Sequence, residues 1–345
     1  MNKNGVRASG IGLFFVLLLA NRYKRYIKRF SIMRINNPSF EIWEQQPGVA
    51  GVYKQIERVG RVCYKSEDHT TDTSAQPFVE RMIKNQHYAM LEHGTVYLCF
   101  DEATREKIKA SEDRYFDIAP WDFYKTNKFS QCMFDGNAYY VTTNLRVLAE
   151  NDRLRDFEAF WSEPQASHPK RVTVHFSTQI AVSREFNRHR ADSMAEQSTR
   201  YCNYSKAKFG NEITINLPTW IKQAMTGSEW AANVNNGLLK VSGQQFMELA
   251  REVADGSATE LDNWVFANLA AEKSYMNIIS AGRKPQEARV ILPLDTATEL
   301  VHTAFVSDWK HFFDLRALGT TGQPHPDAKA IAQPLYEAFK ERGWV

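Results

Sequence analysis

The sequence lacks the short motifs that identify several common enzyme classes. It contains no GxGxxG dinucleotide fingerprint, no GxxxxGK[ST] phosphate loop and no GxSxG nucleophile elbow. Its four cysteines form no CxxC pair, and no His/Cys set has zinc-site spacing, so no metal site is predicted. We expect these cysteines to be reduced thiols in a cytoplasmic protein.

The sequence also has little net charge. The formal charge is +3, and 43% hydrophobic with 24% charged residues is typical of a globular chain long enough for one large domain or two. Residues 1–32 hold seven basic residues and no acid, so the remainder carries −4. A mildly acidic body gives no general attraction for DNA or RNA, and we expect no nucleic-acid partner.

The first 32 residues form an N-terminal extension that allows three interpretations. IGLFFVLLLA, residues 11–20, is an apolar run shorter than the roughly 20 residues of a membrane-spanning helix. We favour a mis-assigned start, with Met33 as the natural beginning. A short hydrophobic anchor over 11–29 is the second interpretation, and a membrane partner is expected only in that case. Export is the third, although the dense positive charge after the run argues against it.

No linker, repeat or low-complexity tract interrupts residues 33–345, so we expect one domain there. Periodicity predicts helices and strands without regular alternation, which argues against a doubly wound parallel sheet. The predicted class is mixed α+β, a helix-rich single domain around a modest, mainly antiparallel sheet. Helices are expected at 51–64, 75–94, 258–282, 296–318 and 326–342, a strand at 95–101, a strand followed by a helix at 137–151 and 171–190, and a short extended or turn segment at 288–294.

Residues 188–201, RHRADSMAEQSTRY, combine three arginines with a histidine, a glutamate and two serines. A guanidinium binds a phosphate or a carbonyl edge through two parallel hydrogen bonds. Serine hydroxyls add further donors, and Glu196 can accept from an N–H group or a ribose hydroxyl. The stretch therefore has the residue types needed to hold a nucleotide, although a solvated charged face or an intersubunit salt-bridge set remains an alternative.

The full pattern RHR-xx-S-xx-E-x-S-x-R-Y resembles the signature of the flavin-dependent thymidylate synthases, in a longer branch of that family. Other segments are similar to family segments and occur in the same order: 60–68, 90–100, 143–148, 284–293 and 305–316. The resemblance covers about 33–345, which would make that stretch the catalytic domain. The ordinary thymidylate synthase uses an activated cysteine after a proline and before a histidine, and none of the cysteines here has that setting.

This resemblance implies a methyltransferase that converts dUMP to dTMP by reductive methylation. Methylenetetrahydrofolate would supply the one-carbon unit, FAD would carry the hydride, and NADPH would be the reductant. Family members are homotetramers whose active sites are shared between subunits, so we expect the protein to bind itself. No covalent enzyme nucleophile is expected.

The resemblance also assigns site residues by position. Arg316 would be the catalytic residue, held against the uracil, where it would stabilise negative charge as N3 loses its proton. The expected dUMP-binding residues are Glu185, Arg188, Glu196, Gln197, Ser198, Thr199, Arg200, Arg289 and Arg316, with backbone N–H groups of Gln197 and Thr199 joining the phosphate contacts. The expected FAD-binding residues are Cys63, His93, Arg188, His189, Arg190, Glu196 and His311. For Cys63 and His93 a purely structural role is an equal alternative.

The chain departs from the family pattern in places. Glu185 stands where a glutamine is common, and a carboxylate accepts hydrogen bonds but does not donate them. Phe305 and Ser307 stand where some members use Asn and Arg towards FAD. Two other function classes stay open: a nucleotide- or RNA-binding module, and a membrane-tethered structural protein resting on residues 11–29.

Overall fold

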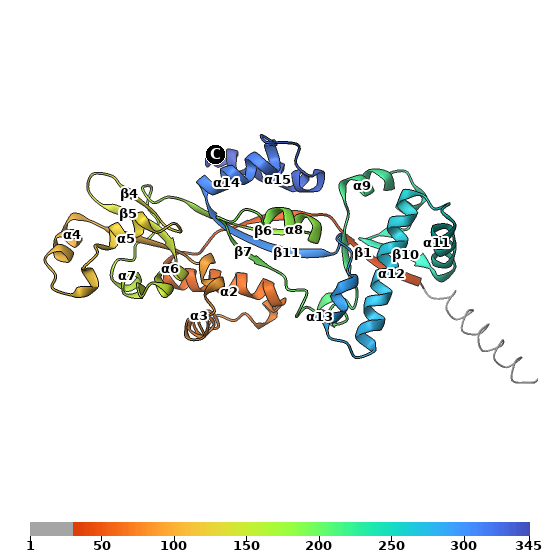
Figure 1. The fold of residues 1–345 in the computed structure, drawn as a ribbon, viewed down its shortest axis with the longest axis horizontal. Coiled ribbons are helices and arrows are strands. Elements are labelled where there is room, and N and C mark those ends of the chain that lie inside the picture. The colour runs from red at the N-terminus through yellow and green to blue at the C-terminus, as the bar shows by residue number, and fades with distance from the viewer. Residues whose placement is uncertain (1–29) are drawn as a thin grey trace, which may run out of the picture. The chain divides into compact units, whose positions relative to one another are not determined.

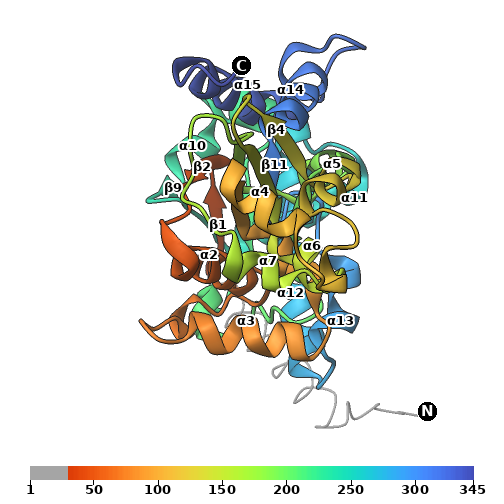
Figure 2. The same cartoon turned by 90° about the vertical axis from the view of Figure 1, so that its left-hand side faces the viewer.

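A computed structural model describes residues 30–345, and Figures 1 and 2 show its helices and strands. The chain folds into two compact units, each built from two stretches of sequence. The described part of unit 1 comprises 30–36 and 203–296, and unit 2 comprises 37–202 and 297–345. The expectation that 33–345 acts as one catalytic domain stays a prediction.

Unit 1 contains a four-stranded sheet in the order β8-β1-β10-β9. Its strands are β1 (Phe30–Asn36), β8 (Thr214–Asn216), β9 (Val234–Asn235) and β10 (Leu238–Ser242). β1 pairs antiparallel with β10 and parallel with β8, so it lies inside the sheet. Met33 and Ile35 alternate into the core, where they join Leu239 and Val241, because side chains two apart on a strand share a face.

The helices of unit 1 are α9 (Thr219–Met225), α10 (Glu229–Ala232), α11 (Gly243–Asp255), α12 (Glu260–Ser280) and α13 (Pro285–Ala288), with the 3₁₀ turns η4 (Ala207–Phe209) and η5 (Arg289–Ile291). α12 confirms the helix predicted at 258–282. It begins at a capping box between Thr259 and Asp262, and the chain leaves it through Gly282 at φ 93°.

Unit 2 is built on a sheet in the order β2-β6-β11-β7, whose pairs are all antiparallel. The strands are β2 (Ser39–Trp43), β6 (Arg171–Gln179), β7 (Ser193–Glu196) and β11 (Ala297–Phe305). β6 and β11 pair along their whole length, from Ala297 opposite Gln179 to Phe305 opposite Arg171. β7, which belongs to the motif at 188–201, pairs with β11 at the edge of this ladder.

Helices cover both faces of this sheet. Figures 1 and 2 show α2 (Gly48–Tyr64) and α3 (Ala75–Lys84) on one side, and α14 (Val306–Phe313) and α15 (Pro326–Glu341) on the other. α8 (Ile180–Phe186) and the π-helical turn η6 (Asp314–Leu318) complete the second side. Phe176, Trp309 and Phe312 are fully buried there, and each such side chain contributes roughly 1.5–3 kcal/mol by leaving water.

A second sheet of unit 2 has the order β3-β5-β4. It comprises β3 (Thr95–Phe100), β4 (Gln131–Phe134) and β5 (Tyr139–Asn144) and is accompanied by α4 (Glu102–Lys109), α5 (Pro120–Thr126), α6 (Leu145–Glu150) and α7 (Leu154–Ala159). Of the 3₁₀ turns, η1 (Glu67–His69) lies between α2 and α3, η2 (Tyr88–His93) between α3 and β3, and η3 (Arg114–Phe116) between α4 and α5. Asn144 ends β5 and caps α6 by accepting from the Val147 N–H at 3.1 Å, which confirms the predicted strand followed by a helix.

The prediction of one helix over 296–318 is wrong in its first half. Residues 297–305 form β11, and the helix begins at Val306. From Leu300 to Phe305 every residue of β11 is buried, because helices cover both faces of the sheet. A strand buried on both faces loses its polar alternation and resembles a buried helix in sequence.

The helix predicted over 75–94 is also too long. α3 ends at Lys84, and Gln86 then takes a left-handed conformation with φ 54°, which stops the helix before η2. The other predicted elements are confirmed, including the strand at 95–101, the strand and helix at 171–190, the turn at 288–294 and the helices at 51–64 and 326–342.

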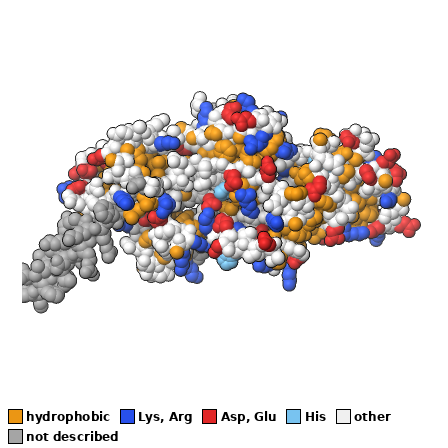
Figure 3. Space-filling view, turned by 180° about the vertical axis from the view of Figure 1, so that it is seen from behind, with side chains coloured by type: hydrophobic (Ala, Val, Ile, Leu, Met, Phe, Trp, Pro, Cys, Tyr) orange, Lys and Arg blue, Asp and Glu red, His pale blue; other side chains and the backbone are white. Residues whose placement is uncertain are grey.

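The mixed α+β class is confirmed, with the strands divided among three small sheets that are antiparallel apart from the β1–β8 pair. Residues 11–29, on which the anchor interpretation rests, lie outside the described residues. Between residues 30 and 345, no helix is long and apolar enough to span a membrane. On the face seen in Figure 3, basic and acidic side chains are interspersed.

Candidate functional site

The first residues of the 188–201 motif occupy a turn between α8 and β7 in unit 2, and the motif continues through β7. α8 ends at Phe186, and the His189 and Asp192 N–H groups donate to the carbonyls of Phe186 and His189. Within this turn Arg188 and Arg190 are exposed, whereas His189 is 5% exposed. The three residues therefore do not form one continuous wall, because the middle side chain points into the protein.

His189 points towards Arg316, which η6 brings to the end of α8. The Arg316 Nε donates to His189 Nε2 at 3.1 Å. The His189 ring is therefore neutral, with its proton on Nδ1. Burial and the nearby Arg316 charge lower the pKa of His189 to about 4, although Asp192 acts in the opposite direction.

Arg316 makes two further hydrogen bonds, both to Glu185 in the last turn of α8. Its Nη1 donates to the Glu185 carboxylate oxygen Oε2 at 2.6 Å, and its Nη2 donates to the Glu185 carbonyl oxygen at 2.6 Å. The Arg316 side chain is 12% exposed and that of Glu185 is 40% exposed. The structure thus brings Glu185, His189 and Arg316 together, and the exposed His311 ring lies 5.7 Å from the His189 ring.

Glu196, at the end of β7, is held by three neutral donors, from α8, from the residue that follows α8 and from β11. Its Oε1 accepts from Ser183 Oγ at 2.7 Å and from Thr298 Oγ1 at 3.2 Å, and its Oε2 accepts from Asn187 Nδ2 at 3.0 Å. This carboxylate is fixed in position and has little accepting capacity left for a ligand.

Residues 197–200 continue from β7 into a turn in which Gln197 is buried and Arg200 is exposed. The Gln197 N–H donates to the Glu299 carbonyl at 2.8 Å, which extends the strand and removes this N–H from the expected phosphate contacts. The Ser198 N–H donates to the Cys63 carbonyl at 2.9 Å. The Ser198 hydroxyl has no partner among residues 30–345, so no histidine is placed to activate it as a nucleophile.

Thr199 is half-buried and Arg200 is exposed beside two tyrosines. The Arg200 guanidinium lies 5.5 Å from the Tyr201 ring, whose centroid is 5.3 Å from that of Tyr64. Arg200 makes no ion pair with any described residue. A free cation beside two aromatic rings is suited to an anionic ligand.

Cys63 lies at the end of α2, beneath this turn. Burial raises the pKa of its thiol to about 11, and its Sγ lies 3.8 Å from the Met90 sulfur. A thiol with a raised pKa is a poor nucleophile at neutral pH. Cys63 lines a cavity of about 360 Å³ together with Tyr64, Met90, Arg146 and Glu150.

His93 lies inside the protein at the end of η2. Its Nδ1 is 2.8 Å from the Thr303 hydroxyl, which is 2.8 Å from the Thr173 hydroxyl on the neighbouring strand. Burial, and then the charge of Arg171, lower the pKa of His93 to about 3. The ring is fully buried, so a structural role in this network is established, whereas contact with FAD stays a prediction.

Several polar residues around this network were not predicted from the sequence. His302 Nδ1 lies 3.0 Å from Asp192 Oδ2, and both side chains are buried. Arg171 donates to Thr95, to the Glu92 carbonyl and to Ser193 at 3.2–3.3 Å. Burial lowers the pKa of Arg171 to about 10. Polar residues inside largely apolar stretches, as in ELVHTAF, were the available signal.

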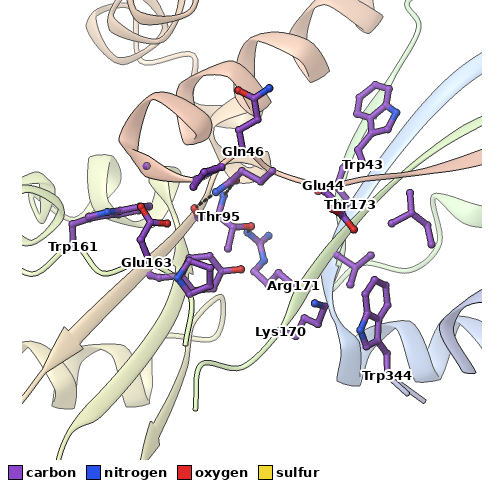
Figure 4. A pocket seen from close by; sticks show the side chains of 17 residues that line it. Trp43, Glu44, Gln46, Thr95, Trp161, Glu163, Lys170, Arg171, Thr173 and Trp344 are labelled. Carbon is purple, nitrogen blue, oxygen red and sulfur yellow. Dashed lines mark hydrogen bonds between the residues drawn. The ribbon is translucent and has the colours of Figure 1, made fainter. Parts of the chain in front are cut away.

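Two further cavities lie in unit 2. One, of about 380 Å³, has Arg171 and Lys170 in its lining, and Figure 4 shows Arg171 pointing towards Thr95. The other, of about 490 Å³, is lined by Arg190 and Ser193 from the motif and by Lys128 and Phe129. Neither Arg190 nor Lys128 makes an ion pair with a described residue, so the second cavity has two available cations.

Arg289 is the one expected site residue that belongs to unit 1. It is exposed at the start of η5, directly after α13.

Comparisons with known proteins identify the relationship. A family model described as thymidylate synthase complementing protein matches residues 166–342, which include the arginine motif and Arg316. Two solved structures of a UMP/dUMP methylase, PolB from Streptomyces cacaoi, bound with 5-Br dUMP and 5-Br UMP, are 14% identical to the chain. They cover 90% of this chain and 93% and 92% of their own, with a TM-score of 0.36 each, too low to establish a shared fold.

A search of curated proteins finds no match to the sequence. The family match spans just over half of the chain and confirms the resemblance that the motif suggested. The chain belongs to the thymidylate synthase complementing protein family.

Proposed function

We propose that the protein is an FAD-dependent thymidylate synthase that methylates dUMP with methylenetetrahydrofolate, and that NADPH is its reductant. The observation that carries the proposal is the contrast in unit 2 between Arg316 and the arginines of the motif. Arg316 is held inside by Glu185 and His189, whereas Arg188, Arg190 and Arg200 are exposed. A half-buried arginine suits a neutral base that becomes anionic, and exposed arginines suit phosphates.

The residues present fit the anionic part of FAD. Arg190 and Lys128 are cations without ion pairs in one cavity, and Cys63 lines another. Arg146 and Glu150 belong to the lining of both cavities, so these adjoin within unit 2. We assign Arg188, Arg190 and His311 to the cofactor, with Lys128 as an addition that the motif does not include. Bound FAD would supply the hydride for the reduction.

For the nucleotide, we assign Ser198, Thr199 and Arg200 to the phosphate of dUMP. The Ser198 hydroxyl and the Arg200 guanidinium have no competing partners in residues 30–345. Glu196 would position α8 and β7 through its three hydrogen bonds. Arg289 is assigned to the nucleotide on the resemblance alone, and so is the homotetramer. The cytoplasmic location is proposed because the four cysteines are expected to be reduced thiols.

We further propose that catalysis needs no covalent enzyme nucleophile. The Cys63 thiol has a raised pKa, and the Ser198 hydroxyl has no base beside it. The remaining device is electrostatic: Arg316 would stabilise the anion that forms when the uracil N3 loses its proton, which makes C5 a better carbon nucleophile.

The first test is the visible spectrum of the purified full-length protein. We expect bound oxidised flavin, a spectral change when dUMP is added, and dTMP formation with methylenetetrahydrofolate and NADPH. A colourless protein that does not take up added FAD but binds dUMP would contradict the proposal and favour a nucleotide-binding module.

A further inference from the structure

The pairing of Arg316 with Glu185 has a chemical implication that rests on the proposed function. Three donors of Arg316 are engaged by the Glu185 carboxylate, the Glu185 carbonyl and His189. The guanidinium has five N–H groups, so two remain available to a ligand. Glu185 Oε1 is also open, because no described residue donates to it.

Glu185, which precedes the 188–201 motif, differs in this respect from the two carboxylates of the motif. Glu196 accepts from Ser183, Asn187 and Thr298. Asp192 is buried against His302. Of these three carboxylates, the half-exposed Glu185 is therefore the one that combines exposure with an oxygen available to a bound base.

The Glu185–Arg316 pair presents a carboxylate acceptor beside guanidinium donors. The imide edge of uracil presents the N3–H donor beside carbonyl acceptors, so a carboxylate next to a guanidinium matches it. The Glu185–Arg316–His189 group carries no net charge, since His189 is neutral, and a uracil base is also neutral. Docking of the base therefore requires no uncompensated charge in this half-buried place.

We propose that Glu185 is a catalytic residue that accepts the N3 proton of dUMP. The N3–H bond breaks, its electron pair stays on the ring, and an O–H bond forms at Glu185 Oε1. The uracil anion then replaces Glu185 as the counter-ion of Arg316. Net charge is the same before and after the transfer, so the site exchanges one ion pair for another.

The test compares Glu185→Gln with wild type in the full-length, flavin-loaded protein. The amide oxygen can still accept from Arg316, but the side chain no longer takes up a proton. We expect dUMP affinity to change by less than about tenfold and turnover to fall about 100-fold. The ultraviolet difference spectrum of bound dUMP, which reports N3 ionisation, should show the uracil anion in wild type and lose it in the variant.

Glu337→Gln is the matched control, because Glu337 forms an exposed ion pair with Lys340 on α15. It should leave turnover and the difference spectrum unchanged. If Glu185→Gln fails to fold, Glu185→Asp keeps the carboxylate, and it should retain the anion signal with reduced turnover.

Two outcomes separate the inference from the function on which it rests. Normal turnover and an unchanged anion signal in Glu185→Gln, with dUMP still bound and methylated, would overturn the role of Glu185 alone. Failure of wild type to bind dUMP would overturn the proposed function and this inference together.

Discussion

The charged and titratable groups of the candidate site in unit 2 differ between its interior and its rim. In the interior, Arg171 and Arg316 are tied to neighbouring groups and the histidines His93 and His189 are held neutral. At the rim, Arg190 and Arg200 make no ion pair with described residues. The difference indicates that the interior groups hold one another in position and respond to charge that forms on a bound base. The rim groups remain available to bind an external anion.

The strongest test of the interior is Arg316→Ala. Loss of this guanidinium removes the stabilisation of the uracil anion, and turnover should fall about 10²–10³-fold. Flavin absorbance should persist, because the rim arginines are untouched. Lys310→Ala, at an exposed position on α14, is the matched control and should retain turnover. Full activity of Arg316→Ala would contradict the assignment of a catalytic role to the interior and a binding role to the rim.

Lowering the pH should reduce the folding stability that the interior histidines contribute before it affects the rim. The pKa values of His93 and His189 are lowered to about 3 and about 4, so the unfolded chain binds more protons as pH falls below about 6.5. Stability from these groups is therefore present above that pH and declines below it, by up to about 1.4 kcal/mol per pH unit for each histidine.

Denaturant unfolding at pH 7.0 and 5.5 (about 1.5 pH units apart) measures this loss. His93→Asn should show a smaller difference between the two pH values than wild type, although it is less stable at both. An equal acid dependence in the two proteins would show that His93 does not contribute.

Arg200→Ala tests the rim. Loss of a charge-assisted hydrogen bond should weaken dUMP binding about 10–100-fold, equivalent to about 1.5–3 kcal/mol. Unfolding free energy should change by less than about 0.5 kcal/mol, because the side chain is exposed. Calorimetric titration with dUMP measures the affinity, and Arg114→Ala, an exposed position elsewhere in unit 2, serves as control. Unaltered affinity would exclude Arg200 from the phosphate site.

The smallest expected effect belongs to Ser198→Ala. A neutral hydroxyl contributes about 0.5–1.5 kcal/mol, so dUMP affinity should fall by a few-fold to about tenfold with residual turnover. Complete loss of chemistry at unchanged dUMP affinity would instead identify Ser198 as a nucleophile.

The strand and the helix that precede the motif were predicted correctly from the sequence. A β-branched run followed by helical spacing placed a strand and a helix at 171–190, and the arginines follow that helix as expected. Such local signals depend on neighbouring residues alone. The strand β11 was misread because its burial on both faces depends on helices distant in the sequence.

Partners inside the site were less predictable. The sequence showed that Glu185 is unusual for the family, but its pairing with Arg316 joins residues 131 positions apart. His302 and Asp192 are 110 positions apart, and the polar residues of ELVHTAF did not indicate which partner His302 would contact. Two such distant polar residues come into contact only after the strands have paired. Their contact therefore depends on the register of the strands rather than on the spacing of residues in the sequence.

The pairing of β1 determines where a shortened chain can begin. Phe30, Ser31 and Ile32 face Ser242, Val241 and Lys240 on β10, upstream of the start expected at Met33. A chain cut at Met33 would lose these three rungs of an inner strand and leave β10 partly unpaired. An activity test on residues 33–345 would then report on sheet integrity as well as on catalysis, so a truncation boundary at or before residue 29 is the sounder choice.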